Sequence, residues 1–404
     1  MKLDKAELPE PSADARAASE MLGGVIAAEI AARGGWISFA RYMELALYEP
    51  GLGYYAGGAQ KFGDHAAGGD FLTAPELTPL FAQALARQVA QVLGASEPFV
   101  MEAGAGSGRL AADLLPALDA LGCLPERYRI LELSGALRAR QQATLAERAP
   151  RYRGRIEWLD ALPDEFSGCL LGNEVLDAMP SHALEWQEDG GIEEVGVAIE
   201  GGKLTEARRP AQGALLRAAQ ALGVAAAYRG EISLAVRAWI TDLSRRLSQG
   251  ALLLIDYGLP RHELYHPQRN GGTLRCHYRH RVHQDPFWYP GLSDITSHVD
   301  FTAVAEAGFD AGLEVLGYCS QANFLLNSGI GELLPKVGAG EICMPGTPLR
   351  GTATANRAEL RARGAVNVLL SPNEMGELFK VIALGRGMPT PLLGFARGDK
   401  VHTL

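Results

Sequence analysis

The stretch Met101-Glu-Ala-Gly-Ala-Gly-Ser-Gly-Arg-Leu110 decides the fold, because three of its glycines follow a short apolar run. That run, 98–101, predicts a buried strand, and residues 109–121 repeat apolar side chains at helical spacing. A glycine-rich turn between a strand and a helix lets a ligand approach the backbone, and the first N–H groups of the helix face an anion. The stretch therefore predicts an α/β domain with a small-molecule site at a strand end.

The spacing of the glycines separates two classes of nucleotide site. A dinucleotide fingerprint, G-x-G-x-x-G, would need its third glycine where the chain has Arg109. The pattern present, Glu102-x-Gly104-x-Gly106-x-Gly108, is typical of enzymes that bind S-adenosylmethionine (SAM). The carboxylate of SAM suits a helix N-terminus, and Glu102 can face the cationic side of the molecule. The alternative is a tight strand–helix turn that binds nothing.

Two acids follow the next two predicted strands. Glu132 ends the strand at 128–131, and a carboxylate there can accept both ribose hydroxyls. Asp160 comes just past the strand at 155–158, where it could accept the adenine amino group, with Trp158 or Leu159 against the ring. Either acid alone would also fit a solvated strand end. Because the glycine turn and both acids follow three successive strands, they predict a nucleoside cofactor at the carboxyl ends of the sheet.

The segment 172–180 follows the fourth predicted strand, where a methyl acceptor would lie. It contains Asn173, which we assign to the cofactor site, and the acids Glu174 and Asp177. Because the two acids are three residues apart, one helical turn would place both carboxylates on one side. Such a pair can bind a cationic guanidinium group, so Glu174 and Asp177 are the candidate catalytic residues. The alternative is a loop asparagine followed by an acidic helix start.

Strand and helix patterns alternate from residue 98 to 173, which predicts a mainly parallel sheet. Antiparallel strands are expected at 183–206, and the buried strand Ala251–Ile255 ends at Asp256-Tyr257, which would border the acceptor crevice. Residues 1–15 look like a disordered tail, and 259–300 look irregular. The predicted division has three parts: an N-terminal helical and Gly/aromatic cap segment at 1–93, a cofactor-binding core at 94–258 with a helical insert at about 206–247, and irregular and helical additions with the last core strands at 259–404.

Composition excludes several classes of function. Of the 404 residues, 47% are hydrophobic and the net charge is −9, whereas nucleic-acid binders carry a basic surface. No run approaches the ~18 apolar residues of a membrane span. Five widely separated cysteines form no zinc spacing and favour a reducing compartment. We therefore expect neither nucleic-acid binding nor membrane insertion.

Two further segments have open interpretations. The stretch with His277, His280 and His283 suggests a metal site, but on a helix these positions would diverge round the axis, and no carboxylate lies among them. We expect no metal and a polar loop instead. The segments Gly53-Tyr54-Tyr55 and Asp70-Phe71 are either a lid over the cofactor or an aromatic cap packed on the sheet.

Several stretches together resemble the MidA family of SAM-dependent methyltransferases over about residues 36–384. They are ISFARYMELALYEPGLGYY, GGDFLTAPEL, MEAGAGSGRLAADLL, GNEVLDAMP, LLIDYG, GTLRCHYRH, DITSHVDF and GELFKVI. The resemblance implies a class I (Rossmann-like) methyltransferase sheet of seven strands in the order 3-2-1-4-5-7-6, with the last strand, near Phe379, antiparallel. It also implies helical N-terminal and mid-chain additions, SAM as the cofactor, and cofactor contacts at Gly104, Gly106, Gly108, Glu132 and Asp160.

The mitochondrial members of that family act as complex I assembly factors and protein arginine methyltransferases. The resemblance thus implies an arginine acceptor on a respiratory complex I subunit or its counterpart, although Glu174 and Asp177 are closer together than the glutamates of the usual arginine methyltransferase loop. Acids near the start argue against a transit peptide. We expect a bacterial cytoplasmic protein, or a mitochondrial matrix protein for a processed eukaryotic member. The alternatives are a non-catalytic assembly or docking protein and a small-molecule methyltransferase.

Overall fold

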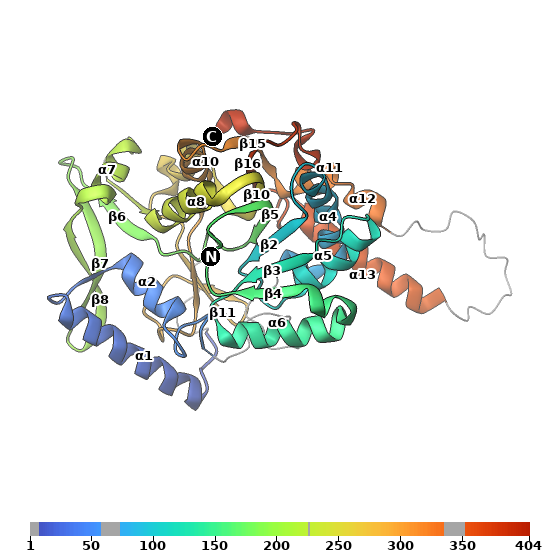
Figure 1. Ribbon diagram of the computed structural model, residues 1–404. Helices are drawn as coiled ribbons and strands as arrows, with labels where there is room; N and C mark the ends of the chain where they lie inside the picture. The colour runs from blue at the N-terminus through green and yellow to red at the C-terminus, as the bar shows by residue number, and fades with distance from the viewer. Residues whose placement is uncertain (1–7, 58–72, 225–226, 335–351) are drawn as a thin grey trace, which may run out of the picture.

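The central feature of the computed structural model is an eight-stranded sheet, seven strands of which run in the order β15-β16-β10-β5-β2-β3-β4 (Figure 1). The structure describes residues 8–57, 73–224, 227–334 and 352–404. When these seven strands are numbered in chain order and the sheet is read from β4 to β15, the order is 3-2-1-4-5-7-6, so the predicted topology is confirmed. The strands are β2 (Phe99–Ala103), β3 (Arg127–Leu131), β4 (Ile156–Leu159), β5 (Phe166–Asn173), β10 (Leu247–Leu259), β15 (Glu314–Ser320) and β16 (Phe379–Arg386), with the short β14 (Val299–Asp300) beside the end of β10.

Strand directions follow the class I pattern. The five strands from β4 to β10 are parallel, and β16 is antiparallel to both β10 and β15. In β10, Leu253 packs into one hydrophobic cluster while Leu252 and Leu254 pack into another. A strand buried on both faces needs a continuous apolar run, which explains the Ala251–Ile255 sequence.

Helices cover both faces of this sheet (Figure 1). One face packs against α4 (Pro79–Leu93) and α5 (Arg109–Ala120), and the other against α8 (Leu234–Arg246) and α10 (Phe301–Asp310). The remaining helices are α1 (Ala13–Ala32), α2 (Phe39–Tyr48), α3 (Ala74–Leu77), α6 (Gly135–Arg148), α7 (Gly213–Ala221), α9 (Arg261–Leu264), α11 (Gln321–Asn327), α12 (Ile330–Leu333) and α13 (Thr352–Leu370). Within the described ranges, no helix has the length and apolarity needed to cross a bilayer.

A second sheet of five strands contains the mid-chain addition. It comprises β1 (Ile37–Ser38), β6 (His182–Trp186), β7 (Ile192–Glu200), β8 (Lys203–Pro210) and β9 (Tyr228–Ile232). The prediction of a helical insert at 206–247 is therefore wrong in part, because β8 extends to Pro210 and β9 lies between α7 and α8. The strand β9 buries Tyr228, Gly230 and Ile232 alternately and pairs antiparallel with β6. The alternating pattern of this five-residue strand is hard to recognise in the sequence, because alanine-rich helical sequence surrounds it.

Two other expectations need correction. The tail expected at 1–15 is too long, because α1 begins at Ala13, where the Ser12 hydroxyl accepts from the Ala15 N–H. Residues 259–300 are not simply irregular, since they contain α9 and a three-stranded sheet of β11 (Arg275–Tyr278), β12 (Arg281–His283) and β13 (Asp294–Thr296).

The N-terminal helices join the second sheet. Ile37 pairs with Val197 across β1 and β7, and the Trp36 indole N–H donates to the Ala207 carbonyl at 2.8 Å. Residues of α1, α2, β6 and β7 share one hydrophobic cluster. The two additions thus pack as one layer next to the core.

Candidate active site

The glycine turn connects β2 to α5 in a conformation that favours glycine. Gly104, Gly106 and Gly108 all have positive φ, at 64°, 51° and 83°. A Cβ on Gly108 would lie 3.0 Å from the Cα of Gln141, and one on Gly104 would lie 3.0 Å from the Val175 side chain. The positive φ favours glycine at all three positions, and close neighbours add to this restriction at Gly104 and Gly108.

Glu102 lies at the end of β2, next to the turn. Its side chain is buried and accepts a hydrogen bond from the Tyr128 hydroxyl at 2.7 Å. Burial raises the pKa of Glu102 to about 7, against the opposing effect of the Tyr128 hydrogen bond. Within the described ranges no ion pair is formed by this buried acid, which therefore fits the cationic side of SAM.

Glu132 is held at the end of β3 by donors from two directions. The Ser134 N–H donates to one oxygen at 2.9 Å, and the Gln141 amide donates to the other at 3.1 Å. Burial raises the pKa of this carboxyl group. Gln141 also accepts from the Trp158 indole N–H at 2.8 Å, so one side chain links the strands β3 and β4. The fixed carboxylate can accept ribose hydroxyls.

Asp160 has a different environment from Glu132. Its side chain is 90% exposed and is paired with Arg138 at 2.7 Å. The same guanidinium donates to the backbone carbonyls of Glu132 and Leu159. The acid predicted to contact adenine therefore lies at the rim of the site in this structure, where an arginine already binds it.

The acceptor segment forms a turn, so the helical turn expected for Glu174 and Asp177 is wrong. Glu174 has a φ of 55°, and its N–H continues the sheet by donating to the Ile255 carbonyl at 2.9 Å. The Asn173 amide donates to the Glu174 carboxylate at 3.0 Å. The side-chain amide oxygen of Asn173 is buried without a hydrogen-bond partner among the described residues. An orphaned acceptor at this strand end fits a donor such as the SAM ammonium group.

The turn curls around a buried acid at the end of β10. One oxygen of Asp256 accepts from the N–H groups of Val175, Leu176 and Asp177, at 3.1, 2.7 and 3.3 Å. The other oxygen accepts from the Tyr257 N–H at 2.8 Å. These bonds explain why a spacing typical of a helix gives a turn instead.

Several acids gather around the turn, and they perturb one another. Burial, with the charge of Asp256, raises the pKa of Glu174 to about 8. Asp177 is almost fully buried, and its burial together with Asp256, Asp294 and Glu174 raises its pKa well above the ordinary value. A group of buried carboxyls with raised pKa values is suited to receive a cationic ligand.

Two tyrosines of the N-terminal segment also reach this site: Tyr48, which the sequence did not indicate, and Tyr55, which lies in the segment predicted to be a lid or an aromatic cap. The Tyr55 hydroxyl donates to Asp294 at 2.8 Å, and its carbonyl accepts from the Ser134 hydroxyl at 3.0 Å. The Tyr48 ring stacks on Tyr55, and its hydroxyl donates to the Ala178 carbonyl at 2.9 Å. This segment therefore contacts both the cofactor side and the acceptor side. Its other half, Asp70-Phe71, lies outside the described residues.

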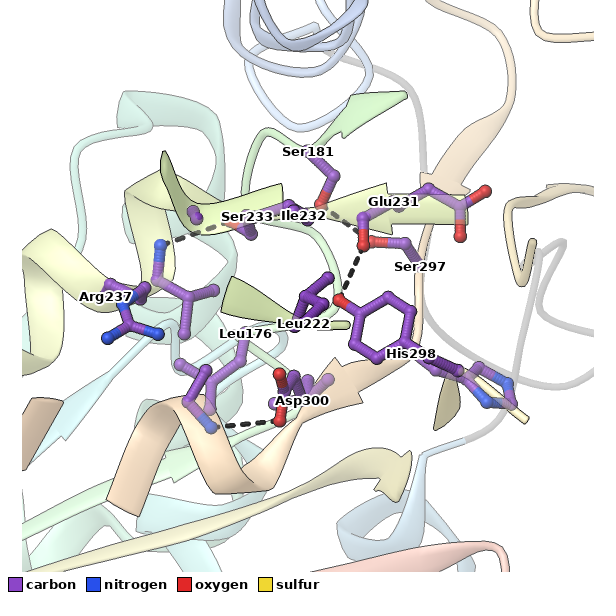
Figure 2. Close-up of a pocket in the computed structure, with 15 residues that line it drawn as sticks. Leu176, Ser181, Leu222, Glu231, Ile232, Ser233, Arg237, Ser297, His298 and Asp300 are labelled. Carbon is purple, nitrogen blue, oxygen red and sulfur yellow. Dashed lines mark hydrogen bonds between the residues drawn. The ribbon is translucent and has the colours of Figure 1, made fainter. Parts of the chain in front are cut away.

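A separate cavity of about 40 Å³ lies behind the acceptor turn, between α8, α10 and β9 (Figure 2). Leu176 lines it, and the hydroxyls of Ser181 and Ser297 bond each other at 2.8 Å in its wall. Glu231 turns its carboxylate away from the cavity, toward Thr273. None of the candidate cofactor or catalytic residues lines this cavity, so it is distinct from the site.

The histidine stretch forms a hairpin instead of a helix or a loop. His277 lies on β11 and His283 on β12, where Cys276 is the partner of His283. The His283 ring bonds the Ser293 hydroxyl at 3.0 Å. Among the residues that the structure describes, no group of three or more His, Cys, Asp or Glu side chains could hold a metal ion.

Comparison with known proteins identifies the fold and its cofactor. Residues 84–319, more than half of the chain, match the family described as "Putative S-adenosyl-L-methionine-dependent methyltransferase". The chain belongs to this family. The MidA resemblance is confirmed, and the protein is a SAM-dependent methyltransferase.

Individual relatives support this assignment. A superfamily member from Burkholderia thailandensis, crystallised with S-adenosyl-homocysteine bound, is 52% identical with a TM-score of 0.91, covering 98% of this chain and 100% of that one. The mouse protein arginine methyltransferase NDUFAF7, which is mitochondrial, is 29% identical over 87% of this chain and 81% of its own length. The zebrafish protein of the same name is 28% identical over 87% and 83%.

Proposed function

We propose that this methyltransferase is a protein arginine N-methyltransferase. The observation that carries the proposal is the buried group of carboxyls on and around the turn Glu174–Asp177, next to the cofactor end of the sheet. A guanidinium group is planar and always charged, and it suits two carboxylates better than an ammonium group does. The names of the mouse and zebrafish relatives point to the same acceptor.

The cofactor contacts in this proposal come from the strand ends. Glu102 and Asn173 face the cationic groups of SAM, the glycine turn faces its carboxylate, and Glu132 accepts the ribose hydroxyls. The exposed Leu133, which follows Glu132 with 77% of its surface accessible, provides an apolar face for the purine. The proposed cofactor residues are Glu102, Gly104, Gly106, Gly108, Glu132, Asp160 and Asn173, with Asp160 at the rim.

The acceptor contacts come from Glu174 and Asp177. SAM, when bound, supplies an electrophilic methyl group for in-line transfer. Glu174 and Asp177 bind the guanidinium, orient one nitrogen and polarise it, and one of the two carboxylates takes the proton that this nitrogen loses as it is methylated. Tyr48 and Asp256 hold the turn that carries both acids, so the acceptor nitrogen is aligned by a fixed backbone.

By analogy with the mitochondrial family members, we place the substrate arginine on a respiratory complex I subunit or its counterpart. The corresponding locations are the bacterial cytoplasm, or the mitochondrial matrix for a eukaryotic member. The assembly or docking protein and the small-molecule methyltransferase remain the competing functions, and one labelling experiment separates all three.

The test is transfer of a tritiated methyl group from SAM to proteins extracted from a strain that lacks the gene. Labelled protein whose hydrolysate contains methylarginine is the expected result. Label in methylated lysine or another side chain would contradict the arginine acceptor. Label only in small molecules would favour the small-molecule enzyme, and SAM binding without any label would favour the docking protein.

A further inference from the structure

The one-turn helix α3 forms hydrogen bonds with both the glycine turn and the acceptor turn. Its own backbone is fixed locally, because the N–H groups of Glu76 and Leu77 both donate to the Thr73 carbonyl, at 3.0 and 3.3 Å. Ala74 is completely buried, in the same hydrophobic cluster as Ala105 of the glycine turn. The proposed function gives α3 no role, although this helix contacts both halves of the site.

On the cofactor side, α3 is bonded through the side chain of Glu76. The Ser107 hydroxyl donates to the Glu76 carboxylate. The same Ser107 oxygen accepts from the Arg109 N–H at 3.3 Å, so the three groups form a chain of hydrogen bonds at the start of α5. Ser107 is buried, and a buried hydroxyl that loses its acceptor is destabilised. Glu76 therefore fixes the backbone of the glycine turn from outside.

On the acceptor side, α3 is bonded through the backbone of Ala74. Burial raises the pKa of Glu174, and a hydrogen bond from the Ala74 N–H to the Glu174 carboxylate acts in the opposite direction. The Asn173 amide donates to the same carboxylate at 3.0 Å, but Asn173 belongs to the acceptor segment itself. The bond from Ala74 comes from a separate element, so it restricts where the Glu174 carboxylate lies relative to the cofactor.

The two contacts of α3 are rigidly connected. Ala74 and Glu76 flank Pro75, and the proline ring fixes its φ near about −65°. A displacement of the Glu76 backbone therefore also displaces the Ala74 N–H. If Glu76 only capped the start of α5, the bond from Ala74 to Glu174 would be unaffected by its loss. The connection through α3 predicts that the acceptor side changes too.

We propose that Glu76 is a positioning residue of the methyl transfer, which fixes α3 against the glycine turn so that Ala74 holds the Glu174 carboxylate in place beside the bound methyl donor. The inference rests on the proposed function, because it assumes that Glu174 contacts the acceptor. A misplacement of about 1 Å between reacting groups can slow a reaction about 100-fold, so the connection should act on kcat.

The first test is Glu76→Ala, measured by tritium transfer at saturating SAM and by calorimetry. We expect kcat to fall about tenfold or more even with SAM fully bound, because Glu174 stays misplaced. The SAM Kd should rise about three- to tenfold. Wild-type kcat at saturating SAM would limit Glu76 to the cofactor side and overturn the proposal.

A conservative variant separates the hydrogen bond from the charge. Glu76→Gln keeps an oxygen that can accept from the Ser107 hydroxyl, so kcat should return to within about threefold of the wild type. If the glutamine variant is as slow as Glu76→Ala, the charge of Glu76 acts directly and the positioning role is wrong. The control is Asp119→Ala, which removes a carboxylate that accepts from the Tyr152 hydroxyl at 2.8 Å near the other end of α5. It should leave both kcat and SAM affinity within about twofold.

Ser107→Ala removes the same hydrogen bond from its other end. If the bond carries the effect, the double variant Glu76→Ala with Ser107→Ala should be no slower than the slower single variant. Additive losses would mean that the two residues act independently, which would contradict the proposal. Ser107→Ala also tests the connection if Glu76→Ala does not fold.

Hydrogen exchange tells failure of the proposed function apart from failure of this inference, because it needs no acceptor. With S-adenosyl-homocysteine bound, the amides of 175–177 should exchange about fivefold faster or more in Glu76→Ala and Ser107→Ala, and at the wild-type rate in Asp119→Ala. If these rates change as expected but the wild type labels no arginine, only the choice of acceptor is wrong. Unchanged exchange in both variants would overturn the connection through α3, whatever the acceptor.

Discussion

The cofactor end and the acceptor end of this site are assembled in different ways. The cofactor residues follow three successive strands, so Glu102, the glycines, Glu132 and Asp160 all lie within one continuous part of the chain. The acceptor end combines Glu174 with Asp256, Asp294 and Tyr55, which come from four separate segments. Tyr55 and Asp294, joined by one hydrogen bond, are 239 residues apart. A short sequence pattern specifies nucleoside binding, whereas acceptor recognition here needs the tertiary fold.

The largest expected effect is at the glycine turn. Gly108→Val introduces a side chain 3.0 Å from the Gln141 backbone at a φ of 83°. Strain and overpacking of about 3 kcal/mol together should weaken SAM binding about 100-fold or more, as measured by calorimetry. The control is Gly122→Ala, at a φ of 71° just past the other end of α5 with no atom within 4 Å. Binding by the valine variant at wild-type affinity would mean that the ligand is elsewhere.

At the acceptor end, Glu174→Gln should abolish methyl transfer and leave SAM affinity nearly intact. Loss of one charge that polarises the acceptor is expected to lower kcat about 100-fold or more. Tritium transfer and calorimetry measure the two quantities separately. Glu157→Gln, an acid that pairs with Arg129 on the surface, is the control. Full activity in Glu174→Gln would exclude the guanidinium site described above.

A comparison within the cofactor end ranks the two strand-end acids. Glu132→Ala removes a buried carboxylate held by two donors and should raise the SAM Kd about tenfold or more. Asp160→Ala removes an exposed, arginine-paired acid and should raise it about threefold or less. Calorimetry on both variants decides the ranking. The reverse order would mean that Asp160 leaves Arg138 when SAM binds.

Glu102 should make cofactor binding dependent on pH. Burial raises its pKa to about 7, so the free protein loses this negative charge as the pH falls through that value. SAM affinity should therefore fall about tenfold between about pH 8 and about pH 6, because only the carboxylate attracts the cation. Glu102→Gln should bind more weakly at high pH and show a flat profile. A sloping profile in that variant would assign the titration to another group.

The smallest expected effect is at the N-terminal segment. Tyr48→Phe removes one hydroxyl-to-carbonyl bond from the acceptor turn and should raise the acceptor KM by about two- to fivefold. Tyr265→Phe removes a bond of the same length, 2.9 Å, from the Glu231 carbonyl and leaves the turn untouched. Equal KM values in both variants would mean that Tyr48 does not position the acceptor.

Local patterns predicted the buried core strands and the glycine turn, whereas the strand order was implied by the resemblance to the MidA family. A positive φ favours glycine wherever it occurs, and a strand buried on both faces needs an apolar run. The backbone of 174–177 could not be predicted in this way, since its N–H groups bind Asp256, about 80 residues later. The same reason hid Tyr48, whose partner Ala178 is close only in the folded chain, and the hydrogen bond from Tyr55 to Asp294. The ion pair of Asp160 with Arg138 could not be predicted either, because no spacing rule connects the two residues.

The pairing of β1 with β7 has a consequence for engineering and evolution. A two-residue strand near the N-terminus completes a sheet that is otherwise built from the mid-chain addition, and both share one hydrophobic cluster. Moving either addition alone into another methyltransferase would expose that cluster and leave the sheet without its partner. The two additions should therefore be inherited, lost or transplanted together.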